Sequence, residues 1–151
     1  MTVGDATMKR SVLRGQSHFE PNNVVGDGPR RWLRSEAAVL LIGSLIAFSH
    51  TREPWWLFAV FLFVPDFSCA GYLQGNRVGA FLYNVAHATP LPAVLIALGY
   101  FQRSPLAEAL GLVWSGHIGV DRLLGYGLKY VDSFQHTHLG VLGRHRQEAS
   151  D

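Results

Sequence analysis

Long apolar runs, separated by short polar turns, fill most of the sequence between residues 34 and 128. A helix needs about 20 mostly apolar residues to cross the hydrocarbon core of a bilayer, and only helices or closed barrels can cross it. We place four spans at about residues 34–50, 55–73, 78–100 and 105–128. The sequence therefore predicts an all-α fold, a four-transmembrane-helix bundle with short connections, and the lipid bilayer as its surroundings.

Two of these spans contain prolines that should interrupt a regular helix. Pro65 lies about two thirds of the way along the second span, and Pro90 and Pro92 follow His87 in the third. Proline removes one backbone hydrogen bond and clashes with the preceding turn. We therefore expect the second span to loosen at Pro65 and the third to kink or break just past His87.

The segments that flank the spans are polar. We interpret residues 1–31 as a disordered, flexible cytoplasmic leader without the apolar region of a secretory signal. Residues 32–144 then form the transmembrane domain, and residues 145–151 a disordered tail. Of the 13 Lys and Arg residues, only Arg52 and Arg103 fall in the loops that would lie opposite the termini, while Arg122 lies within the fourth span. This bias predicts that both termini are cytoplasmic.

The remaining composition excludes some classes of protein. The single cysteine, Cys69, allows neither an intrachain disulfide nor a cysteine-based zinc site. The basic residues are scattered and form no nucleic-acid-binding motif, so we expect no nucleic-acid partner.

Costly polar residues occur in every span, and all fall on the predicted cytoplasmic half. His117 and Asp121 are four residues apart in the fourth span and share one helix face. The others are Glu36 at the start of the first span, Asp66 in the second, and Tyr83, Asn84 and His87 in the third. Ionisable residues within a membrane are expensive and indicate a functional site unless shown otherwise.

Imidazole and carboxylate groups together are usual ligands of Zn²⁺, Fe²⁺ or Mn²⁺. We take Asp66, His87, His117 and Asp121 as the metal ligands. Glu36 and His138 are the expected catalytic acid–base groups or accessory ligands, with His136 beside them, and Arg122, Tyr83 and Asn84 are the expected substrate contacts. The first hypothesis is a membrane-embedded, metal-dependent enzyme that acts on a lipid or amphiphile at the cytoplasmic leaflet.

Two other functions use the same residues. In a transporter or binding protein for a small solute or a proton, His87, His117 and Asp121 would titrate rather than bind a metal. In a structural membrane protein, the His117–Asp121 pair would only tie helices together within a buried polar network. A homo-oligomer is a further hypothesis, because four spans of this size could need a second copy to close a site.

The order of the motifs resembles the DUF4260 family of small bacterial integral membrane proteins. The resemblance covers residues 32–144. It rests on Arg34-x-Glu36, Trp55-Trp56-Leu57-Phe58, Pro65-Asp66 with Gly71-Tyr72, Arg77-x-Gly79, Tyr83-Asn84-x-x-His87, His117-x-Gly119-x-Asp121-Arg122, the run Gly125 to Tyr130, and Thr137-His138-Leu139-Gly140. It implies a multi-pass protein of the bacterial inner membrane, and it implies no activity, cofactor or substrate.

A weaker likeness is to membrane-bound metal-dependent hydrolases. These also carry a Pro-Asp near a helix end, as at Pro65-Asp66, a Thr-His pair, as at Thr137-His138, and an Asp on a late helix. Here Asp66 stands alone rather than in a run of acids and histidine, and the motif order differs. The likeness only favours a metal over metal-free chemistry.

Overall fold

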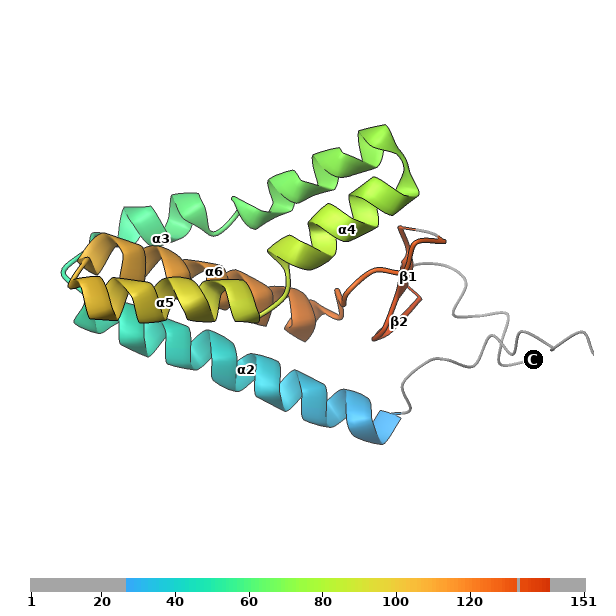
Figure 1. The fold of residues 1–151 in the computed structure, drawn as a ribbon. Helices are drawn as coiled ribbons and strands as arrows, with labels where there is room; N and C mark the ends of the chain where they lie inside the picture. The colour runs from blue at the N-terminus through green and yellow to red at the C-terminus, as the bar shows by residue number, and fades with distance from the viewer. Residues whose placement is uncertain (1–26, 133, 142–151) are drawn as a thin grey trace, which may run out of the picture.

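The computed structural model describes residues 27–132 and 134–141, and these are mostly helical (Figure 1). The elements in chain order are α2 (Asp27–His50), α3 (Trp55–Phe61), the 3₁₀ helix η1 (Pro65–Gln74), α4 (Asn76–Ala86), α5 (Pro90–Gln102), α6 (Pro105–Leu124), β1 (His136–Thr137) and β2 (Gly140–Val141). The two short strands pair antiparallel, with His136 opposite Val141. The predicted leader up to residue 26 and the predicted tail at 145–151 lie outside the described residues.

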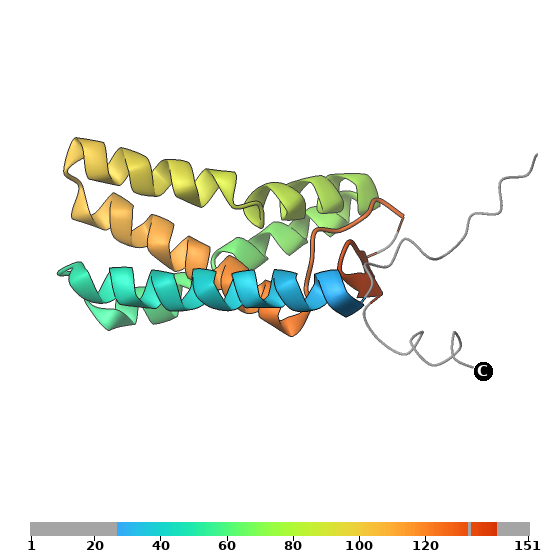
Figure 2. The same cartoon turned by 90° about the horizontal axis from the view of Figure 1, so that it is seen from below.

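Helix α6 is the centre of the bundle. It packs along α2 on one side and along α5 on the other, as Figure 2 shows. Small residues allow the backbones to approach closely at both contacts. A Cβ atom at Gly119 would lie 2.9 Å from the backbone nitrogen of Leu41, and one at Gly111 would lie 2.9 Å from that of Ile96. The residues on α6 are therefore held at fixed positions relative to both neighbours.

A hydrophobic core fills the end of the bundle where α2, α3 and α6 meet. Phe48 and Phe58 meet edge to face, with ring centroids 5.1 Å apart. Leu57, Ala109, Leu112 and Val113 complete this buried cluster. The pair of η1 and α4 forms a second unit that inclines away from the bundle toward β1 and β2 (Figure 1).

The predicted interruptions of the second and third spans are confirmed. Helix α3 ends at Phe61 and the chain resumes as a 3₁₀ helix at Pro65, so the second span is not one continuous α-helix. Helix α4 ends at Ala86 and α5 begins at Pro90, with His87 as the C-cap of α4. Each break lies beside a predicted metal ligand.

Two helix ends differ from the predicted bounds. Helix α2 begins at Asp27, inside the predicted leader, and its first turn accommodates Pro29 because the first backbone N–H groups of a helix have no partner within it. Helix α6 ends at Leu124 rather than near 128, because Gly125 adopts a left-handed φ of 95°. The backbone N–H of Tyr126 then donates to the Asp121 carbonyl, which closes the helix end.

Three described segments are long and apolar enough to cross a membrane: Gly28–His50, Trp55–Gln74 and Asn76–Gln102. Helix α6 has 20 residues but carries Glu108, Asp121 and Arg122, and it is not among them. Many large apolar side chains point outward, including those of Val39, Ile46, Phe63, Phe81 and Phe101. Such a surface is compatible with a membrane protein.

Candidate metal centre

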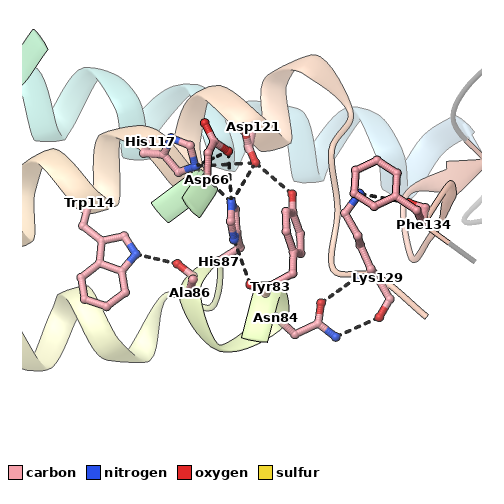
Figure 3. Close-up of polar contacts among 10 residues, drawn as sticks. All are labelled: Asp66, Tyr83, Asn84, Ala86, His87, Trp114, His117, Asp121, Lys129 and Phe134. Atoms are coloured by element: carbon pink, nitrogen blue, oxygen red, sulfur yellow. Dashed lines mark hydrogen bonds and ion pairs between the residues drawn. The ribbon is translucent and has the colours of Figure 1, made fainter. Parts of the chain in front are cut away.

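Four of the predicted site residues converge at the junction of η1, α4 and α6 (Figure 3). Asp66 comes from η1, His87 from the end of α4, and His117 and Asp121 from one face of α6. One ligand atom from each of the four lies within 4.8 Å of all the others. These residues are the complete set that the sequence predicted as metal ligands.

The helix breaks bring the ligands together. Pro65 begins the 3₁₀ helix on which Asp66 is the second residue. His87 has left the helical conformation, with φ −109° and ψ 10°, because the chain turns there toward Pro90. The two ligands of α6 need no break, since residues four apart lie one above the other on a helix.

The distances are those of an open ligand cage. The Nε2 atoms of His87 and His117 are 3.1 Å apart. The Asp121 carboxylate lies 3.4 Å from Nε2 of His87, and the Asp66 carboxylate lies 3.6 Å from Nε2 of His117. Four ligands placed about 2.1 Å from one tetrahedral ion lie roughly 3.4 Å from each other. The separations between histidine and carboxylate atoms, 3.4–3.8 Å, are close to that value, and all four ligand atoms lie within 4.8 Å of one another.

Hydrogen bonding fixes which nitrogen of His87 faces the cluster. Its Nδ1 lies 2.8 Å from the backbone carbonyl oxygen of Tyr83, which can only accept a hydrogen bond. Nδ1 must therefore carry the proton in the neutral ring, and Nε2 offers its lone pair to the cluster. In metal-bound histidines, the ring nitrogen that does not bind the metal typically donates a hydrogen bond to a carbonyl or carboxylate in the same way.

The ligands differ in exposure. His87 and His117 are buried, whereas 16% of the Asp121 side chain and 48% of the Asp66 side chain are exposed. The cluster is therefore closed on the side of the two helices and open beside Asp66. An exchangeable water or a substrate atom could reach a bound ion only from that side.

Tyr83 supports the two ligands that it touches. Its hydroxyl donates to Oδ2 of Asp121 at 3.0 Å, and its ring stacks on the His87 imidazole with centroids 3.7 Å apart. Tyr83 is buried, so the structure places it behind the ligands and not at an open surface. The predicted substrate contact of Tyr83 is untested, but the observed contacts are those of a positioning residue.

Asn84 fastens the segment after α6 to α4. Its side-chain NH₂ donates to the Lys129 carbonyl at 2.8 Å, and its side-chain oxygen accepts from the Lys129 N–H at 2.7 Å. Both ends of the Asn84 amide are thus bonded to protein backbone. A role in substrate binding stays a prediction for Asn84 and for Arg122, which is partly exposed on α6 next to Asp121.

Glu36 and His138 lie outside the four-residue cluster. Glu36 is exposed on α2, because its neighbour Ala37 faces α6 and successive helical residues point about 100° apart. Nδ1 of His138 accepts a hydrogen bond of 2.8 Å from the Leu128 N–H. Burial lowers the pKa of His138. The predicted acid–base roles remain untested, and the side chain of His136 is outside the described residues.

Lys129 is a buried residue that sequence reasoning took for part of an interfacial exit. Its Nζ donates to the Phe134 carbonyl at 3.0 Å and lies 4.6 Å from the centroid of the Tyr83 ring. Burial lowers the pKa of Lys129. No local signal could have revealed this position, because the two hydrogen bonds that hold the Lys129 backbone come from Asn84, 45 positions away in the chain.

Comparison with known proteins gives one match. The family model described as "Domain of unknown function (DUF4260)" matches residues 30–142. No curated protein and no solved structure matches the chain. The match begins within α2, covers every later element and includes all four converging side chains.

Proposed function

We propose that this chain, which belongs to the DUF4260 family, is a multi-pass membrane protein whose Asp66, His87, His117 and Asp121 bind one divalent metal ion. The observation that carries the proposal is the convergence of two imidazole nitrogens and two carboxylates from three separate segments. A site of nitrogen and oxygen ligands without sulfur suits Zn²⁺, Fe²⁺ or Mn²⁺.

The charge of the cluster favours a cation. Asp66 and Asp121 place two carboxylates next to buried imidazoles. Asp121 is mostly buried, and a buried charge is costly unless it is paired or coordinates a metal, whereas about half of the Asp66 side chain is exposed. Tyr83 provides one hydrogen bond to Asp121, which cannot balance two charges. A divalent ion would neutralise both carboxylates and use the lone pair that His87 already directs inward.

The proposed setting is the inner membrane of a bacterial cell with both termini in the cytoplasm. Four passes, formed by α2, by α3 with η1, by α4 with α5, and by α6, return the chain to its starting side. The start of α2 and the strands β1 and β2 lie at the same end of the molecule (Figure 1). The distribution of Lys and Arg supports assigning that end to the cytoplasm. The metal cluster then lies in the cytoplasmic half of the bundle.

The proposed activity is a metal-dependent reaction, such as hydrolysis, on a lipid or amphiphile of the cytoplasmic leaflet. A bound divalent ion supplies polarisation of a substrate oxygen and activation of water. In an ester hydrolysis the water oxygen bonds to the carbonyl carbon or phosphorus, the ester bond breaks, and the leaving oxygen takes a proton. Asp66 lines the open side where the substrate would enter, while His87, His117 and Asp121 hold the closed side.

Metal content tests the proposal. The protein is purified in detergent without chelators, and bound metals are measured by mass spectrometry. We expect one divalent ion per chain, lost in both His117→Ala and Asp66→Ala. The matched control is His50→Ala, because His50 is an exposed histidine at the end of α2. A wild-type protein that binds no ion even after loading with Zn²⁺, Fe²⁺ and Mn²⁺ would contradict the proposal.

A further inference from the structure

A cavity of about 400 Å³ opens next to the four-residue cluster. Its wall is formed by residues of α3, η1, α4, α5 and α6, among them Phe61, Leu95 and Leu110. The volume lies within the range of small-molecule sites in proteins. The wall is almost entirely apolar, so the part of a ligand that it fits is a hydrocarbon group.

The cavity adjoins the segments that carry the cluster, although none of the four proposed ligands lines it. Three wall residues are neighbours of proposed ligands along the chain: Pro65 beside Asp66, Ala86 beside His87, and Trp114 one turn before His117. The Trp114 indole N–H donates to the Ala86 carbonyl, and this bond holds the indole ring in place (Figure 3). A ligand in the cavity would therefore have one end next to the segments that carry the proposed metal ligands.

One polar atom in the wall has no protein partner. The Ser68 hydroxyl is shielded from solvent and has no hydrogen-bond partner among the residues that the structure describes. Ser68 lines the cavity two residues after Asp66 on η1. Buried hydroxyl groups are normally hydrogen-bonded. The hydroxyl is thus available to a polar group of a ligand at the end of the cavity that lies near Asp66.

From these observations we infer that the cavity holds one alkyl chain of a membrane amphiphile, with its polar head at Ser68 and Asp66 and its tail toward Leu110 and Leu95. The inference rests on the proposed function, because it names the substrate class of that site. Phe61 and Val64, at the rim, are partly exposed on the apolar outer surface, so a chain can enter sideways from the bilayer.

The direction of the alkyl chain in the cavity agrees with the proposed orientation of the protein in the membrane. Along α6, Leu110 lies toward the start of the helix and His117 and Asp121 lie toward its end. An amphiphile of the cytoplasmic leaflet has its head toward the cytoplasm and its tail toward the middle of the bilayer. The head would then meet the cluster and the tail would extend past Trp114 toward Leu110.

Photo-crosslinking tests the inference in protein reconstituted into phosphatidylcholine vesicles. One probe is a long-chain fatty acid with a diazirine near its methyl end, and the second carries the diazirine beside its carboxylate. We expect the first probe to label Leu110 and Leu95 and the second to label the peptide that contains Asp66 and Ser68. Reversed positions, or labelling of Leu110 and Leu95 no stronger than at the exposed Val94, would overturn the inference.

A matched pair of variants on α5 controls for non-specific labelling. Leu95→Trp fills the cavity, whereas Leu98→Trp changes an exposed residue one turn away that does not line it. Labelling at Leu110 should fall several-fold in the first variant and stay unchanged in the second. Equal labelling in the two variants would overturn the inference. If Leu95→Trp does not fold, Leu110→Phe in the same wall replaces it, and labelling is read at Leu95.

Metal content, measured on the same samples, separates this inference from the proposed function. Bound metal without labelling of the cavity would overturn the alkyl-chain site and leave the metal centre standing. Labelling that Leu95→Trp abolishes, in a protein that binds no metal, would support the alkyl-chain site and contradict the proposed metal centre.

Discussion

The Nε2 atoms of His87 and His117 face each other at 3.1 Å, although 30 residues separate them in the chain. His87 gets there because α4 ends one residue earlier, and His117 because α6 is held between α2 and α5. These two imidazoles and the carboxylates of Asp66 and Asp121 form the candidate metal centre.

Removing the Tyr83 hydroxyl should weaken metal binding without unfolding the protein. In Tyr83→Phe, Asp121 loses a hydrogen bond of 3.0 Å while the aromatic ring stays on His87. Loss of a group that orients a ligand typically lowers metal affinity about 10- to 100-fold. Titration of the metal-free protein with Zn²⁺ measures the change. Tyr126→Phe is the control, because Tyr126 is exposed, and equal affinities in the two variants would contradict the role of Tyr83.

Asn84→Ala should destabilise the protein. The substitution removes two hydrogen bonds to the Lys129 backbone and leaves its N–H and carbonyl without these partners. We expect a loss of about 1–3 kcal/mol in the free energy of unfolding. Thermal unfolding in detergent, followed by circular dichroism, measures it. Asn76→Ala should cost much less, because Asn76 is exposed and makes one bond of 3.3 Å; a similar loss in both variants would refute this account.

Two glycine-to-alanine changes should have opposite effects on stability. At Gly119 a new methyl group would lie 2.9 Å from the Leu41 nitrogen and 3.0 Å from the Ala37 carbonyl, so α2 and α6 would have to separate. Overpacking of this kind costs about 1–3 kcal/mol. At Gly43 nothing lies within 4 Å, and alanine should stabilise α2 by about 0.5–1 kcal/mol. The difference in melting temperature measures both, and a Gly119→Ala variant as stable as wild type would argue against the close contact.

His138 should make stability depend on pH. Burial lowers its pKa from the ordinary 6.5, and protonation would also remove the acceptor for the Leu128 N–H. The unfolded chain then binds a proton at a higher pH than the folded protein, so stability falls as the pH drops below 6.5 and levels off below the folded-state pKa. Unfolding measured across this range should show a weaker decline in His138→Gln. A variant at the exposed His50, His50→Gln, should follow wild type, and superimposable curves for all three proteins would contradict the prediction.

The sequence predicted two features of this site: which residues are costly to place in an apolar segment, and which of them share a helix face. Asp66, His87, His117 and Asp121 stand out because each is an expensive residue in an apolar run, and the one-turn spacing on α6 follows from helix geometry. The prolines at 65 and 90 indicated where the helices break. These signals are local, and for that reason a single sequence reveals them.

The sequence could not predict features that depend on how the helices rotate and approach each other. Glu36 sits at the start of an apolar run as a site residue would, yet the contact of Ala37 with α6 turns it outward. Lys129 is buried because Asn84 holds its backbone from a distant helix. The cavity beside Trp114 lies between five elements, and its presence depends on how they pack, which a residue pattern does not indicate.

X-ray absorption at the metal edge tests the central claim most directly. The protein, loaded with Zn²⁺ and freed of unbound ion, should show a first shell of nitrogen and oxygen atoms at about 2.0–2.2 Å. The imidazole scattering in this spectrum should correspond to two histidines, and His117→Ala treated in the same way should retain no zinc. Cys69→Ala should leave the spectrum unchanged. A sulfur shell at about 2.3 Å, or a spectrum of hydrated zinc without imidazole, would contradict a metal centre at Asp66, His87, His117 and Asp121.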